Sequence, residues 1–149
     1  MSERDLTQLG VDLVVASARL TRMASRDVSA MPPAAMRLLG RLDALGPTRI
    51  SELAKADRCS QPTMSNLVQR QEEQGWVRRE ADPADSRASL ISLTDAGFAE
   101  LQRARQEAGA AIATRLRRLP ATDLTTLEAA VAVMHRILTL SDVLEDTPR

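Results

Sequence analysis

The sequence contains few aromatic side chains, one cysteine and no long run of apolar residues. Trp76 and Phe98 are its only Trp, Phe or Tyr residues, so aliphatic side chains must form most of any hydrophobic core. The single Cys59 excludes a disulfide within the chain. The apolar runs are far shorter than the roughly 20 residues that cross a bilayer, and the charged residues 1–5 lead into no stretch of the signal-peptide type. We therefore expect a reduced, cytoplasmic protein that does not associate with membranes.

Positive and negative charges are balanced along the chain. The 20 basic and 20 acidic residues give a formal net charge of zero, so the overall charge gives no argument for nucleic-acid binding. His135 is the only histidine, and we find no group of His, Cys and carboxylate residues at the spacing of metal ligands. The acidic residues are scattered over predicted helix surfaces. We therefore predict no cofactor, no metal and no enzymatic activity.

The chain has 149 residues, a length that can bury a core without disulfides or metals. Proline and glycine divide it into segments. Apolar residues at spacings of three and four predict a first helix that Pro32-Pro33 end and a second helix that Gly46 ends. Further along, Thr94 can cap a long helix that runs to about Arg118, and Thr122 can cap a last helix.

The middle of the chain changes its period twice. Two short helices come first, which Ser51 and Ser60 can cap, and Gly75 can close the second in the left-handed conformation. Residues 76–79 and 90–93 then have the composition of two short strands joined by a turn. This order predicts a mainly α fold with a small β-hairpin wing, which is the outline of a winged helix-turn-helix.

The helix that Ser60 caps has one apolar and one polar face. At about 100° per residue, Met64, Leu67 and Val68 fall together on the apolar face. The opposite face holds hydroxyls, amides and one arginine, with no acidic side chain from Ser60 to Gln71. Such side chains bond to base edges and phosphates, whereas an ordinary solvated helix, the other interpretation, carries mixed charges. The residues that we predict to contact DNA are Ser60, Gln61, Thr63, Ser65, Asn66, Gln69 and Arg70.

The predicted hairpin supplies a further arginine near its tip. Arg87 on a protruding loop can enter a minor groove, where negative potential is focused. Asp85 can orient its guanidinium through a charge-assisted hydrogen bond, which makes Asp85 a candidate for wing orientation. A plain surface ion pair on a turn is the alternative.

Five segments of the chain stand in an order and spacing that are similar to the signature of the MarR family. They are Ser51–Ala54, Pro62–Arg70, Gly75–Arg79, Asp82–Ala88 and Leu93–Gly97. Each is weak by itself, and together they form a specific pattern.

The resemblance covers residues 50–97 in motif and the whole chain in architecture. It implies a bacterial repressor that binds a pseudo-palindromic double-stranded DNA operator as a homodimer, with a small anionic or aromatic compound as effector. It also implies helices in successive major grooves and wing tips in the flanking minor grooves. On this basis residues 1–30 and 119–149 are dimerisation arms, 31–97 are the DNA-binding lobe, and 98–118 are the linking helix.

The apolar stripes of the first and last helices leave two interpretations open. They can pack into a bundle within one chain, or pair with the arms of a second subunit. The stripe residues that we assign to dimerisation are Leu6, Leu9, Leu13, Leu127, Val131, Met134 and Leu138.

Two other functions compete with DNA reading. One is a winged helix used only for protein contact, which the zero net charge favours. The other is a redox-responsive regulator that uses Cys59, although a lone cysteine is more often a small buried apolar residue. Two residues also depart from the family pattern. We expect Gln71 at the rim of the apolar face with a local hydrogen bond, and Trp76 packed at the junction of strand and helix.

Overall fold

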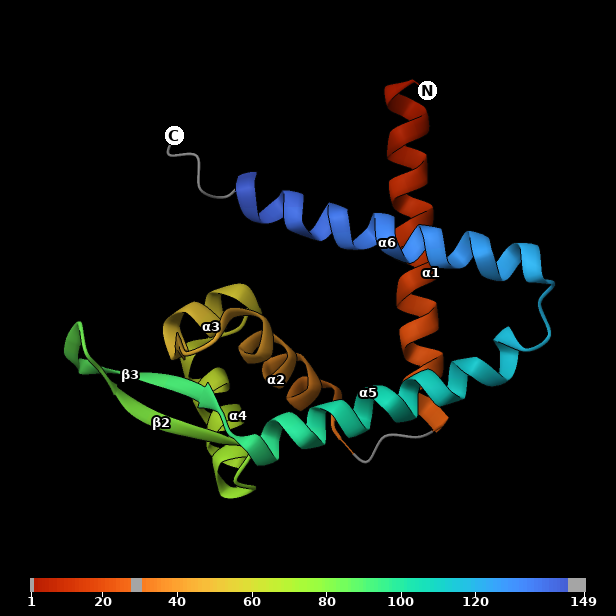
Figure 1. Cartoon of the computed structure of the whole chain (residues 1–149). Coiled ribbons are helices and arrows are strands. Elements are labelled where there is room, and N and C mark those ends of the chain that lie inside the picture. The colour runs from red at the N-terminus through yellow and green to blue at the C-terminus, as the bar shows by residue number, and fades with distance from the viewer. Residues whose placement is uncertain (1, 28–30, 145–149) are drawn as a thin grey trace. The chain divides into compact units, whose positions relative to one another are not determined.

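The computed structural model describes residues 2–27 and 31–144, except for the side chains of residues 25–27, 86–87 and 141–144. These residues form six helices and a small antiparallel sheet, which confirms the predicted mainly α class (Figure 1). The elements in chain order are α1 (Glu3–Asp27), α2 (Pro33–Leu45), β1 (Thr48–Arg49), α3 (Ile50–Ala56), α4 (Gln61–Glu73), β2 (Val77–Asp82), β3 (Asp85–Leu93), α5 (Asp95–Leu116) and α6 (Ala121–Leu144).

The described residues divide into two compact units, one on each side of the bond between Ala111 and Ile112. None of the described helices is both long and apolar enough to cross a membrane.

The first unit contains one continuous core between α2, α3, α4, the sheet and the start of α5. As the scarcity of aromatic residues predicts, the core is built from aliphatic side chains and methionine. Trp76 packs against it while remaining partly exposed, at the junction of α4 and β2 as predicted. The buried core residues are Met31, Ala35, Leu38, Leu39, Leu42, Leu53, Ala54, Met64, Val68, Val77, Ile91, Leu101 and Ala104.

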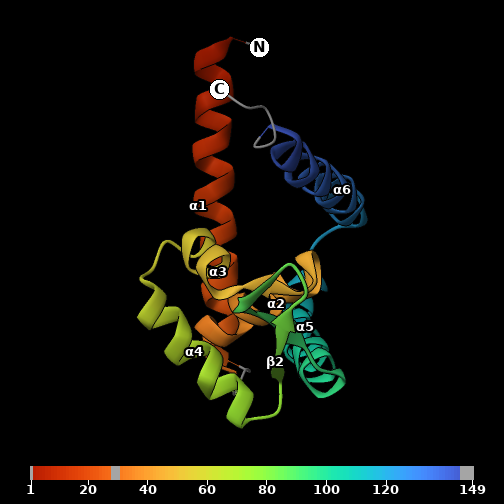
Figure 2. The ribbon, with the colours of Figure 1, turned by 90° about the vertical axis from the view of Figure 1, so that its left-hand side faces the viewer.

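The sheet has three strands, one more than the sequence predicts. β2 and β3 form the predicted hairpin, here called the wing (residues 77–93), and they extend further toward its tip than expected. The additional strand, β1, pairs with β3 through Thr48 opposite Ile91 and Arg49 opposite Leu90. The strand order is therefore β1-β3-β2, and Figure 2 shows the hairpin beside α4. Two residues are too few to produce an alternating pattern, so the periodicity of the sequence does not predict β1.

Two of the predicted helix caps are confirmed. The hydroxyl of Ser60 accepts a hydrogen bond of 3.3 Å from the backbone amide of Thr63 at the start of α4. The hydroxyl of Thr94 accepts one of 3.0 Å from the amide of Gly97 at the start of α5. Both bonds satisfy amides that a helix start leaves without a partner.

The other two predicted caps are wrong, because Ser51 and Thr122 are each the second residue of their helix. Ser51 lies inside α3, which begins at Ile50 and is capped by Arg49, whose amide donates to the Glu52 carboxylate over 3.2 Å. Likewise α6 begins at Ala121, and the Pro120 carbonyl accepts the amides of Asp123 and Leu124. A serine or threonine one position inside a helix has the same sequence signature as a cap, and only the backbone angles separate the two.

Gly75 ends α4 as predicted, because its φ of 73° is in the left-handed region that favours glycine. The prediction for Gln71 is only half right. Its side chain is buried, at 6% exposure, rather than at the rim, but its amide nitrogen does make a local hydrogen bond of 3.4 Å to the Leu67 carbonyl. That bond lowers the cost of placing an amide among apolar side chains.

Candidate nucleic-acid interface

The two faces of α4 differ in burial as sharply as in composition. Met64 and Val68 are 2% and 0% exposed and belong to the core. The predicted contact residues lie outward, and none of them is buried. Ser65 is half-buried, and the exposed members are Ser60, Gln61, Thr63, Asn66, Gln69 and Arg70.

Local hydrogen bonds hold both ends of this polar face. The hydroxyls of Ser60 and Thr63 lie 2.8 Å apart in addition to the capping bond, which fixes the start of α4. One turn before its end, the amide nitrogen of Gln69 donates to the Glu73 carboxylate over 3.2 Å. The helix that presents these polar side chains therefore has a first turn that is held by side-chain hydrogen bonds.

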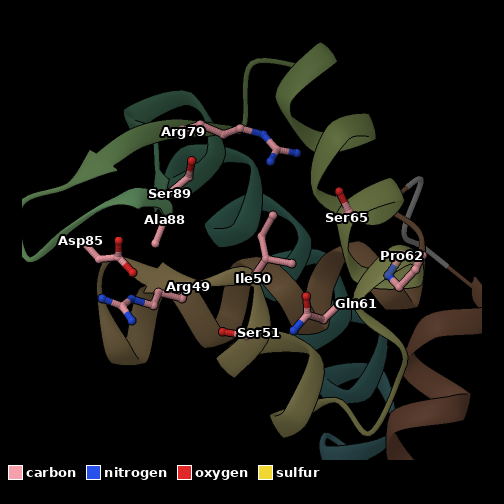
Figure 3. A pocket seen from close by; sticks show the side chains of 10 residues that line it. All are labelled: Arg49, Ile50, Ser51, Gln61, Pro62, Ser65, Arg79, Asp85, Ala88 and Ser89. Atoms are coloured by element: carbon pink, nitrogen blue, oxygen red, sulfur yellow. The ribbon is translucent and has the colours of Figure 1, made fainter.

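A groove of about 640 Å³ lies between the start of α3, the start of α4 and the wing (Figure 3). Two arginines and three serine hydroxyls give it a polar, hydrogen-bonding lining. This groove is defined by its lining residues Arg49, Ile50, Ser51, Gln61, Pro62, Ser65, Arg79, Asp85, Ala88 and Ser89.

Both arginines of the groove are held by carboxylates. Arg79 of β2 donates to Glu72 of α4 over 2.9 Å. Arg49 binds Asp82 at the end of β2 through Nε at 2.6 Å and Nη2 at 2.5 Å. The Arg49–Asp82 pair has no signature in the sequence, because its residues are 33 positions apart and no local spacing connects them.

The carboxylate of Asp82 is held in its charged form. Its pKa lies below the ordinary value of 3.8, first because the amide of Ala84 donates to it and then because Arg49 pairs with it. A carboxyl group with a lowered pKa stabilises the folded state above its unfolded pKa, and this contribution is lost as the pH falls through the folded pKa. The connection between β2 and Arg49 is therefore fully present at neutral pH.

The wing arginine that the sequence predicts is part of the second strand of the hairpin. The backbone of Arg87 belongs to β3, but its side chain lies outside the described residues. Asp85 is exposed and lies beside Arg49 in the groove (Figure 3), and its charge adds to that of Asp82 in raising the pKa of Arg49. Orientation of Arg87 by Asp85 stays a prediction.

The only cysteine and the only histidine of the chain have ordinary environments. Cys59 is partly buried and packs against the core just before α4. His135 is exposed on α6. Within residues 2–27 and 31–144, no three His, Cys, Asp or Glu residues are grouped so that they could hold a metal ion.

The terminal helices α1 and α6 each carry large apolar side chains that are exposed. Leu13 and Met134 are half-buried, and the other predicted stripe residues are exposed. The exposed fractions are 51% for Leu6, 55% for Leu9, 41% for Leu127, 50% for Val131 and 65% for Leu138.

Further exposed apolar residues lie outside the predicted stripes. In α1 they are Val11, Val14 and Val15, and in α6 they are Val133, Ile137 and Leu140. At about 100° per residue, those of α6 extend its apolar surface over about half of the circumference. A search for one stripe at spacings of three and four finds a single face and misses the second.

Comparisons with known proteins agree with this architecture. The model of the MarR family matches residues 31–89, which run from the core of the lobe into the wing. The HTH-type transcriptional regulator YxaD of Bacillus subtilis is 37% identical over 60 residues. That alignment covers 40% of this chain and 42% of YxaD, so it spans less than half of the relative's length.

Solved structures share the fold over nearly the whole chain. A protein of Pseudomonas aeruginosa PA01 has a TM-score of 0.73 and 27% identity, covering 93% of this chain and 98% of that one. A MarR family protein of Bacillus stearothermophilus has a TM-score of 0.70 and 22% identity, covering 93% and 99%. In its winged-helix part the chain therefore resembles the MarR family, and it shares its fold with a solved member of that family.

Proposed function

We propose that this protein is a sequence-specific DNA-binding transcriptional regulator whose helix α4 enters the major groove. The observation that carries the proposal is the exposed face of α4, which presents amides, hydroxyls and one arginine without a carboxylate from Ser60 to Gln71. Asn66 and Gln69 can bond bidentately to adenine, and Arg70 can bond to guanine. Because the other face of α4 is buried in the core, this polar face points away from the fold.

The wing is the second contact in this proposal. Arg87 lies in β3 near the hairpin tip, where an arginine can reach the narrow minor groove beside the site read by α4. The serine hydroxyls of the groove between wing and α4 suit the phosphate backbone, which runs between the two DNA grooves.

We also propose that the protein acts as a homodimer on a pseudo-palindromic operator. The exposed apolar side chains of α1 and α6 support this, since a second copy would remove them from water. A two-fold dimer would place its two α4 helices in major grooves about one helical turn, or 34 Å, apart. Bound over a promoter, such a dimer would block transcription. A small anionic or aromatic ligand that favours another conformation would release it.

Titration of DNA tests the proposed function. We expect fluorescence anisotropy to show tight binding of the DNA upstream of the protein's own gene, with affinity that falls steeply as salt rises. A duplex of random sequence should bind at least 1,000-fold more weakly. Equal affinity for both duplexes, or none at low salt, would refute DNA reading and favour the protein-contact module.

Two glutamates on the apolar side of α6 should abolish the dimer. In the Val131→Glu/Leu138→Glu variant, self-association would have to bury two carboxylates, and we expect it to weaken by at least about 100-fold. Light scattering should then report the 16.2 kDa of one chain rather than twice that mass.

The matched control places the same two glutamates on the polar side of α6, as Thr125→Glu/Arg136→Glu. At about 100° per residue both positions lie opposite the stripe, so this variant should remain dimeric. If the wild-type protein is already a stable monomer, or if both variants dissociate alike, the arms do not form the interface proposed here.

A further inference from the structure

We propose that the Arg49–Asp82 ion pair is a positioning device that fixes the wing at a set distance from α4, so that both elements can engage one DNA duplex together. This inference rests on the proposed function. It assigns a role to two residues that are not themselves on the DNA-reading face of α4.

The pair bridges the sheet from one edge strand to the other. Arg49 ends β1 and Asp82 ends β2, while β3 lies between these strands. The guanidinium reaches across β3 and places two nitrogens within 2.6 Å of one Asp82 oxygen. The other oxygen accepts the amide of Ala84 in the wing turn over 2.8 Å. A single carboxylate, 6% exposed, thus ties the turn of the wing to β1.

Arg49 is itself fixed to β3 and to α3, the helix that packs against α4. Its backbone pairs with Leu90, and its amide donates to Glu52 in the first turn of α3. Helix α3 packs directly against α4. The contacts therefore run without a break from the wing turn through Asp82 and Arg49 to α3 and α4.

A different ion pair holds the base of the wing, so the role of the Arg49–Asp82 pair is distinct from holding that base. Arg79 near the base of β2 is bonded to Glu72 of α4. Beyond it the hairpin register shifts between Ala81 and Asp82, an irregularity of the kind that bends a hairpin. The Arg49–Asp82 pair acts past that point, where the hairpin ladder alone does not fix the direction of the tip.

Charge and position make opposite predictions for the loss of Asp82. Its carboxylate lies next to a groove that faces DNA in the proposed function, so simple electrostatics expects tighter DNA binding when the acid is removed. If Asp82 is a positioning residue, its loss should weaken DNA binding, because the wing would then have to be ordered when DNA binds. The sign of the change therefore distinguishes the two roles.

The first experiment compares Asp82→Ala with Glu80→Ala. Both remove one acid from β2, but Glu80 is bonded to its sheet neighbours Arg78 and Ser92 rather than to Arg49. The probe is a duplex selected by the wild-type protein from a random pool. We expect Asp82→Ala to bind it about tenfold more weakly, the loss of one good contact. Glu80→Ala should bind as well as wild type or more tightly.

The same duplex shortened at both ends provides a readout that a purely structural role would not change. Removal of the flanking base pairs should weaken wild type and Glu80→Ala, which use the wing, and leave Asp82→Ala with little further loss. If Asp82→Ala binds as tightly as Glu80→Ala to both duplexes while remaining folded, the positioning role is wrong.

Backbone amide exchange in the free protein tests the same idea without DNA. Exchange of the amides of residues 81–90 should be at least tenfold faster in Asp82→Ala and in Arg49→Ala than in wild type and Glu80→Ala. Arg49→Ala removes the pair from the other side and keeps the test valid if Asp82→Ala misfolds. Unchanged amide exchange in folded Arg49→Ala would show that the Arg49–Asp82 pair does not position the wing. A wild-type protein that selects no DNA sequence would instead overturn the proposed function, and the exchange result would still decide whether the pair positions the wing.

Discussion

Replacement of Gly97 by alanine should destabilise the lobe by about 4 kcal/mol or more, a large part of the 5–15 kcal/mol that is typical of a domain. A Cβ at this position would lie 1.9 Å from the carbonyl oxygen of Trp76 and 2.8 Å from its carbonyl carbon. Those are backbone atoms, so no side-chain rotation relieves the overlap. The Trp76 oxygen is also held in place, since it accepts the Thr94 amide over 3.1 Å.

The comparison variant is Gly109→Ala in the same helix, α5. Nothing lies within 4 Å of a Cβ added there, and alanine is favoured over glycine inside a helix by up to about 1 kcal/mol. Urea unfolding followed by circular dichroism should therefore give opposite shifts of the midpoint for the two variants. Similar midpoints for both would mean that the approach of Gly97 to Trp76 is not as close as described.

A single negative charge on the outward face of α4 should remove specific DNA binding. We expect Asn66→Asp to lower operator affinity by about 100-fold, through loss of an amide contact and repulsion from phosphate. The new carboxylate would also stand four residues before Arg70, where it can pair with that arginine and withdraw it from DNA. Anisotropy titration on the selected duplex measures the effect.

The substitution should leave the fold intact, because it conserves shape and position 66 is exposed. Its control is Gln74→Glu at the end of the same helix, where Glu72 and Glu73 already stand. That variant adds the same charge and should bind DNA within about threefold of wild type. If the two variants bind equally well, α4 does not present this face to DNA.

Local chemistry made much of the lobe predictable from sequence. The hydroxyl of Ser60 marks the start of α4, and the positive φ of Gly75 marks its end. Each of these signals comes from one residue type at one position. The division of α4 into faces follows from its helical period. Gln71 shows the limit of that approach, since periodicity placed it on the apolar face but only packing could bury it completely.

The parts that escaped prediction depend on contacts between distant segments. Strand β1 exists only because β3 lies beside Thr48 and Arg49, and the groove needs α3, α4 and the wing together. Asp82 belongs to a segment that resembles the family signature, but nothing in the sequence connects it with Arg49, 33 residues earlier. The same reason hides the second apolar surface of α6, which a single stripe cannot represent.

The junction where α4, the wing and α5 meet has a mechanical consequence. The Thr94 hydroxyl donates to the Gly75 carbonyl over 2.6 Å while accepting the amide of Gly97, and its own amide is bonded to Trp76. One residue thereby joins the end of α4, the residue just before the wing and the first turn of α5. A rotation of α5 about its own axis would therefore turn α4 and the wing together as one rigid body. Any signal that reaches α5 would therefore change the direction of both elements rather than their spacing.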